Sequence, residues 1–230
     1  MNETEEHICK IGMTNLLGNS TKLILNFPSS TIGTDDLNVY QLRHSKDMDK
    51  VIDINIELDK NFNHDTTEFQ SEQFKEWALH PSSSFYACDY KEQFFGLLFT
   101  LRLKPEVFER IMELEIDEKD LTVDDFATFD EIGCNHMISF FAMSEKVASL
   151  LFIRYYAHLI ANQKVIREVG LATMMEDAKK LIRNMNLHHH SSKNVGEGLE
   201  LQTYRETLPN FLASEKVLKM ILSKQSCPEE

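Results

Sequence analysis

The chain has 230 residues, of which 42% are hydrophobic and 27% are charged, which suits one large domain with a core of its own. Its net charge at pH 7 is −13 and it has no basic stripe, so we expect neither nucleic acid nor an anionic membrane surface as a partner. The longest apolar stretch, Val147–Ala161, is too short to span a membrane and contains Arg154. The cysteines are scattered and the first residues are acidic, which indicates reduced thiols in a cytoplasmic protein without a signal peptide.

The first 36 residues are expected to form an N-terminal extension, with a short strand at Leu23–Phe27 followed by a loop rich in Ser, Thr and Gly. From residue 37 onward, the spacing of apolar residues predicts a strand, two helices and a hairpin of two strands. Their predicted ranges are Leu37–Arg43, Asp47–Leu58, Phe69–Leu79, Ser84–Tyr90 and Gln93–Leu103. Gly96, inside the last strand, indicates a bulge or a close approach of another part of the chain.

Residues 106–131 form an acidic segment between the hairpin and the next strand. We expect it to be an insertion, with a helix at Val107–Leu114. The charges of Asp117–Asp125 indicate a solvated face or a lid.

The most informative stretch is His136–Asn162, which reads as a short apolar strand, a turn and a long apolar helix. The strand is predicted at His136–Met143. Ser144 is a predicted N-cap because its hydroxyl can accept a free N–H of the first helical turn, and Glu145 follows where the helix dipole favours negative charge. A strand that leads into a helix N-terminus presents free N–H groups, which can bind an anion such as a pyrophosphate.

The remaining sequence predicts a strand over residues 164–175 and an amphipathic helix over residues 175–187. His188–Lys193 and Leu199–Leu208 are predicted to form a final hairpin, and Ser214–Ser223 a terminal helix. Hairpins on one side and a strand–helix–strand unit on the other predict an α/β fold with a mixed central sheet and helices on both faces.

Four patches carry a resemblance to a known family. The opening strand and helix of the GNAT (N-acetyltransferase) superfamily resemble TDDLNVYQLRHSKDMDKVIDIN, its central hairpin resembles SFYACDYKEQFFGLLFTLRL, and its closing strand resembles YRETL. The family's late patch is similar to TMMEDAKKLIRNMNL, with Met175, Ala178, Leu181-Ile182 and Asn186-Leu187 at the recurring positions. The resemblance implies a GNAT-like acyltransferase domain at 37–208, after the extension at 1–36 and before a C-terminal helix and tail at 209–230.

Members of this superfamily transfer an acyl group from a coenzyme A thioester to an amine. The resemblance therefore implies acetyl-CoA or another acyl-CoA as donor, and a small-molecule or protein amine as acceptor. It places the pantetheine arm along the backbone of Phe141, Ala142 and Met143. The residues that it implies at the pyrophosphate are Lys146, Val147, Ala148 and Ser149. His136 and Glu131, at and before the strand that would border the substrate, are the candidate bases for the amine proton.

The chain departs from the family at two positions. The family's pyrophosphate loop has the pattern Arg/Gln-x-x-Gly-x-Gly/Ala, whereas Met143–Ser149 contains no glycine. The tyrosine that serves the family as general acid corresponds to Ile182, which cannot donate a proton. A second segment, Arg167–Ala172, fits the loop pattern, but it would turn Leu150–Ala161 into an unusually long strand.

These departures keep a second class of function open, a catalytically inactive GNAT-fold binding or regulatory module. In such a module the apolar helix Val147–Ala161 could serve a homodimer interface. A longer acyl donor is a third alternative, because the predicted strand His136–Met143 is rich in Phe and Met and could accept an acyl tail. Neither the acceptor nor the acyl length follows from these residues.

Several other residues could suggest chemistry but are expected to be structural. Tyr155, Tyr156 and His158 lie inside the apolar helix and are expected to pack in the core. In the run His188–His190, alternate residues would share one face of a strand, a spacing that a metal can use. The sequence identifies no third ligand nearby, so we assign no metal site.

Overall fold

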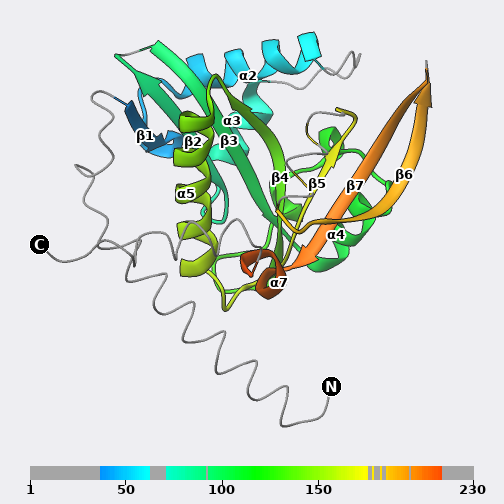
Figure 1. Ribbon diagram of the computed structural model, residues 1–230. Helices are drawn as coiled ribbons and strands as arrows, with labels where there is room; N and C mark the ends of the chain where they lie inside the picture. Colours follow the sequence, from blue (N-terminus) through cyan, green and yellow to red (C-terminus); the bar gives the residue numbers. More distant parts are fainter. Residues whose placement is uncertain are drawn as a thin grey trace, which may run out of the picture.

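The computed structural model describes residues 37–62, 71–91, 93–175, 178, 182, 185–196 and 198–213. Within these residues the chain forms one seven-stranded mixed sheet in the order β1-β2-β3-β4-β5-β7-β6. Helix α5 crosses one face of this sheet, and helices α2, α3 and α4 lie on the other (Figure 1). The predicted mixed sheet with helices on both faces is therefore confirmed.

The first four strands pair in chain order and are all antiparallel. They are β1 (Leu37–Gln41), β2 (Ser84–Tyr90), β3 (Gln93–Leu103) and β4 (Gly133–Ala142). Helices α2 (Met48–Phe62) and α3 (Ser71–Leu79) connect β1 to β2. Strand β3 lies between β2 and β4 and its last eight residues are all buried, so it forms the centre of the core.

The second half of the sheet begins with a parallel pair. Helix α5 (Glu145–Ala161) carries the chain from β4 to β5 (Ile166–Thr173), which runs parallel to β4. Strands β6 (His188–Gly196) and β7 (Leu199–Thr207) form a hairpin, and β7 pairs with β5. The short helix α7 (Leu208–Leu212) ends the described chain.

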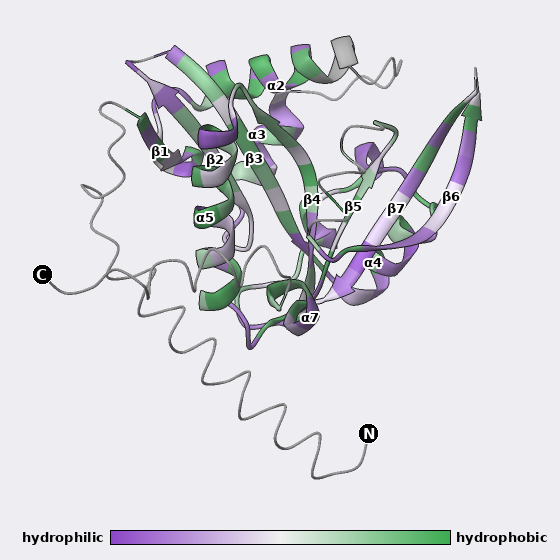
Figure 2. Cartoon of the chain, in the orientation of Figure 1, coloured by the Kyte–Doolittle hydropathy of each residue, from purple (hydrophilic) through white to green (hydrophobic). Residues whose placement is uncertain are grey.

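The two faces of the sheet bury separate clusters because side chains alternate along each strand. Leu98 and Met137 point towards α5 and α7, whereas Leu97 and Phe99 point towards α2, α3 and α4. Strands β3 and β4 are largely hydrophobic and the hairpin of β6 and β7 is more hydrophilic (Figure 2). The sheet is thus covered on both faces around β3 and β4 and is more solvated at β6.

The acidic segment contributes to the core as well as to the surface. It contains α4 (Pro105–Met112) and two 3-10 helices, η2 (Glu118–Asp120) and η3 (Val123–Asp125). Phe108 and Phe126 are buried in the cluster on the α4 face. Most charged residues of the segment are exposed, as predicted for a solvated face. The prediction did not include the burial of the apolar side chains between them.

Most predicted elements are present, and β2 and β3 have the predicted bounds. The predicted strand Leu23–Phe27, the helix Ser214–Ser223 and most of the helix over 175–187 lie outside the described residues. Helix α7 was not predicted, because five residues are too few to show a period. No described helix is long and apolar enough to cross a membrane.

Candidate functional site

Strands β4 and β5 pair only over the first half of β4 and then diverge. Their register runs from Gly133 opposite Ile166 to Met137 opposite Leu171, and no described residue pairs with β4 on this side beyond Met137. The next five residues, 138–142, are only half-buried. The divergence is visible in Figure 1, where the far ends of β4 and β5 separate. Backbone groups on this edge of β4 can therefore form hydrogen bonds with an extended ligand.

A β-bulge lies where the strands begin to diverge. In the pairing of β3 with β4, Phe99 is opposite Ser139 and Thr100 is opposite Met137, so Ile138 is an extra residue. The hydroxyl of Ser139 then points towards α2 and donates to Asn55 Oδ1 at 2.5 Å. The bulge thus redirects the second half of β4 and places polar groups on its α2 face.

The end of β4 lies close to the first turn of α5 because Gly96 has no side chain. A Cβ atom at Gly96 would lie 2.7 Å from the Phe141 carbonyl oxygen and 2.7 Å from Val147 Cγ1. The backbone N–H of Met143 donates to Phe95 O at 3.0 Å and continues the pairing of β3 with β4. The close approach predicted at Gly96 is confirmed, and a bulge in β2–β3 lies next to it.

The N-terminus of α5 is capped as predicted. Ser144 Oγ accepts from the N–H of Val147 at 3.3 Å, and Ser144 O accepts from the N–H of Ala148 at 3.0 Å. The N–H groups of Glu145 and Lys146 have no partner within the described residues. These two N–H groups, at the positive end of the helix dipole, are the ones available to an anion.

The seven residues predicted to hold coenzyme A are adjacent in space as well as in sequence, from the end of β4 to the first turn of α5. The side chains of Met143, Lys146 and Ser149 are exposed. The side chain of Val147 is buried, so only its backbone is available for contacts with a ligand. Ser149 Oγ donates to Glu145 O at 2.8 Å. The alternative loop at 167–172 is wrong, because these residues lie in strand β5 and 150–161 lie in helix α5.

His136 lies at the inner end of the divergence. It pairs with Gly170 one residue before the last β4–β5 pair, and its side chain is fully buried on the α4 face beside the Phe108 ring. Its Nε2 is 2.5 Å from Glu118 Oε1, and its Nδ1 is buried with no partner among the described residues. With Glu118 ionised and His136 neutral, Nε2–H donates to the carboxylate and Nδ1 keeps a free lone pair.

Glu118 is a candidate site residue that the sequence did not reveal. It begins η2 in the acidic segment, and its side chain is 22% exposed, so the Glu118–His136 pair can be reached from solvent only through the carboxylate. Gln73 on α3 donates to Lys119 O at 2.8 Å and to Leu121 O at 3.0 Å, which holds η2 in place. Nothing in the local sequence distinguishes Glu118 from the neighbouring acidic residues.

Glu131, the second predicted base, is placed elsewhere. It is exposed in the turn before β4, where its carboxylate accepts from the backbone N–H of Thr128 at 2.8 Å. This hydrogen bond lowers the pKa of Glu131, which makes the carboxylate a weaker base. The structure does not bring Glu131 to His136.

Tyr155, Tyr156 and His158 of α5 pack inside the domain, as predicted. Tyr155 is buried and its hydroxyl donates to Asn135 Oδ1 at 2.7 Å. The Nδ1 atom of His158 is 2.9 Å from Ser84 Oγ, and burial lowers the pKa of His158 to about 4. Ile182, at the position of the family's tyrosine, is buried.

Helix α5 buries its apolar side chains within one chain. The buried residues are Val147, Leu150, Leu151, Phe152, Tyr155, Tyr156, Leu159 and Ile160. Four of its five exposed residues are polar, namely Glu145, Lys146, Ser149 and Arg154, and the fifth is Ala161. A homodimer stays a prediction, and the apolar character of this helix no longer supports it.

Comparison with known proteins gives a likeness in structure only. No model of a known protein family matches the sequence, and no curated protein matches it. The structure is similar to FeeM, an N-acyl amino acid synthase from uncultured soil microbes, at 7% identity with a TM-score of 0.54, over 79% of this chain and 96% of FeeM. It is also similar to an acetyltransferase from Streptococcus agalactiae, at 11% identity with a TM-score of 0.50, over 74% of this chain and 98% of that one.

At these identities the two likenesses concern the fold and not the activity. They agree with the predicted α/β fold, a mixed central sheet that contains a strand–helix–strand unit. The chain has the GNAT fold.

Proposed function

We propose that the protein is an acyl-CoA-dependent N-acyltransferase, with acetyl-CoA as the expected donor and an amine of a small molecule or protein as the acceptor. One observation carries the proposal. Within the described residues, this edge of β4 has no partner strand beyond Met137, and β4 leads directly into the capped N-terminus of α5. An extended chain of amides that ends in a pyrophosphate matches both features.

The residues at this place fit such a ligand. Within Phe141–Met143, Ala142 has its backbone N–H and C=O on the edge that faces away from β3 and offers them to the pantetheine amides. The N–H groups of Glu145 and Lys146 offer hydrogen bonds to the pyrophosphate. The Lys146 ammonium adds a positive charge that offsets the exposed carboxylate of Glu145. Acyl-CoA, when bound, would supply the acyl group as an activated thioester and leave as coenzyme A.

The remaining chemistry concerns the amine proton. As the acceptor nitrogen bonds to the thioester carbonyl carbon and the C–S bond breaks, the nitrogen must lose a proton. The partly exposed Glu118 carboxylate takes this proton, and the buried His136 behind it holds the carboxylate in place. Ile182 cannot protonate the leaving thiolate, so that proton comes from water. Positioning the amine against the thioester supplies most of the rate.

The test is a thermal-shift titration with coenzyme A and acetyl-CoA. A ligand that binds the folded state raises the melting temperature as its concentration increases. Ser149→Glu places a carboxylate in the exposed first turn of α5 and should abolish the shift. Ala161→Glu, which adds the same charge at the exposed far end of α5, should leave the shift unchanged.

Three outcomes are informative. A shift that Ser149→Glu removes, together with release of free thiol when amines are added, supports the transferase. Binding without thiol release over a broad panel of amines and acyl lengths identifies a catalytically inactive GNAT-fold module. No shift at millimolar ligand overturns the coenzyme A site in both forms.

A further inference from the structure

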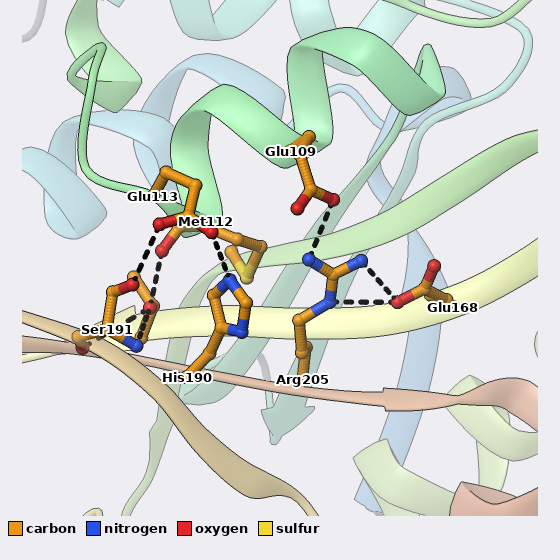
Figure 3. A network of polar contacts seen from close by, with 8 residues as sticks. Glu109, Met112, Glu113, Glu168, His190, Ser191 and Arg205 are labelled. Carbon is orange, nitrogen blue, oxygen red and sulfur yellow. Dashed lines mark hydrogen bonds and ion pairs between the residues drawn. The ribbon is translucent and has the colours of Figure 1, made fainter.

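A second cluster of reactive side chains lies on the α4 face of the hairpin, away from the divergence of β4 and β5. Glu109 and Glu113 project from one side of α4 and its C-cap, and His190 projects towards them from β6 (Figure 3). One ligand atom from each of the three lies within 4.8 Å of the other two. The Nε2 atom of His190 is 2.9 Å from Glu113 Oε1, so a proton now lies between the histidine and the carboxylate.

The backbones that carry these ligands are held together by a buried hydroxyl. Thr203 on β7 is fully buried, and its Oγ1 donates to Met112 O at 2.7 Å and accepts from the N–H of Ser191 at 3.1 Å. Met112 precedes Glu113 and Ser191 follows His190. The two ligand-bearing segments are therefore fixed relative to each other, and only side-chain rotations are needed to bring the ligands together.

The charge of the cluster favours a cation. The cluster contains three carboxylates, of Glu109, Glu113 and Glu168, and one guanidinium, of Arg205, which pairs with Glu109 and Glu168 only. With His190 neutral, these groups carry a net charge of −2. Arg205 Nη1 donates to Glu109 at 2.7 Å, while its Nε and Nη2 donate to Glu168 at 2.8 and 2.6 Å. Arg205 keeps both bonds to Glu168 if Glu109 turns towards another cation.

We propose that Glu109, Glu113 and His190 form a zinc site, with water completing the coordination. Two carboxylate oxygens and one imidazole nitrogen are a donor set that Zn²⁺ accepts at about 2.0–2.2 Å. The histidine makes the site more than an acidic surface, because imidazole selects Zn²⁺ over Mg²⁺ and Ca²⁺. His190 would bind through Nε2 with its proton on Nδ1, and Ser191 Oγ, 3.2 Å from Glu113 Oε2, orients the carboxylate.

Zinc at this site would join α4 to the hairpin of β6 and β7. The site is independent of the proposed acyl transfer and uses none of its residues. His188 does not belong to it, because its Nδ1 is 2.7 Å from Glu206 Oε2 on β7. His188 and His190 thus have different partners, although the sequence alone suggested that they would share one face of a strand.

The experiment uses the full chain without an added histidine tag, freed of metal by dialysis against a chelator. Titration with Zn²⁺ should raise the melting temperature by about 3–5 °C for each tenfold rise in free zinc above saturation. His190→Ala and Glu113→Gln should each remove this rise, whereas His188→Ala should keep it. The melting temperatures of the metal-free variants show whether each one folds.

Cobalt provides a second readout that does not depend on stability. Co²⁺ bound to the wild type should give a visible absorption band that Zn²⁺ displaces and that His190→Ala lacks. The proposal is overturned if zinc causes no shift, if His190→Ala and Glu113→Gln bind like the wild type, or if His188→Ala is the variant that loses binding. Wild-type binding by His190→Ala and Glu113→Gln, or loss of binding in His188→Ala, would mean that the metal binds to other residues.

Discussion

The hydrogen bond between α5 and β4 leads to a sharp prediction about stability. Tyr155 and Asn135 are both fully buried, and the Tyr155 hydroxyl donates to Asn135 Oδ1 at 2.7 Å. Tyr155→Phe keeps the ring but leaves a buried acceptor without its donor, which costs about 1–3 kcal/mol. We expect the free energy of unfolding in urea to fall by about 2 kcal/mol and the melting temperature by about 4–8 °C.

The adjacent tyrosine supplies the control. Tyr156 is also buried, but its hydroxyl has no partner among the residues that the structure describes. Tyr156→Phe should therefore change the free energy of unfolding by less than about 0.5 kcal/mol. The reasoning would be refuted if both variants lost the same free energy of unfolding, or if Tyr155→Phe were as stable as the wild type. Either result would mean that this hydrogen bond does not stabilise the packing of α5 on β4.

Three further predictions use other contacts. Gly96→Ala should lower the free energy of unfolding by about 1–3 kcal/mol in urea denaturation, because the new Cβ meets a backbone oxygen at 2.7 Å, while Ala at the exposed Gln93 should not. The pKa of His158 is lowered to about 4 in the folded protein, against 6.5 normally, so the unfolded chain binds the extra proton. Stability should therefore be lost as the pH falls from about 6.5 to about 4, by about 3 kcal/mol in all, and less so in His158→Gln. In amine assays Glu118→Gln should lower kcat/KM about 10²–10⁴-fold, whereas Asp120→Asn on the same 3-10 helix should not.

Local signals in the sequence predicted the elements that depend on neighbours in the chain. The hairpin of β2 and β3 was predicted with its observed bounds because two apolar runs flank a two-residue turn. The cap at Ser144 was predicted because its hydroxyl needs only the N–H groups of the following turn. Where β4 loses its partner could not be predicted, since the end of strand pairing depends on the path of β5 and not on the residues of β4.

The candidate site was only half predictable for the same reason. His136 stands out because it is a titratable residue in an apolar strand, but its partner Glu118 lies 18 residues earlier in a run of charges. The same holds for His190, whose partner Glu113 is 77 residues away. In both cases the histidine carries a signal in the sequence and the carboxylate does not, because acidic residues are common on the surface.

The acidic segment is an integral part of the folded domain and not an appended lid. A Cβ atom at Gly170 would lie 2.7 Å from Phe108 Cζ, so the glycine lets α4 pack directly on β5 beside His136. This packing buries the imidazole, and the chain that follows α4 then returns Glu118 to it. A solvated loop could supply the carboxylate but not the apolar cover, and without that cover water would compete for the contact between Glu118 and His136. The apolar residues of the segment hold the Glu118–His136 pair in place, and the Glu118 carboxylate connects the pair to solvent.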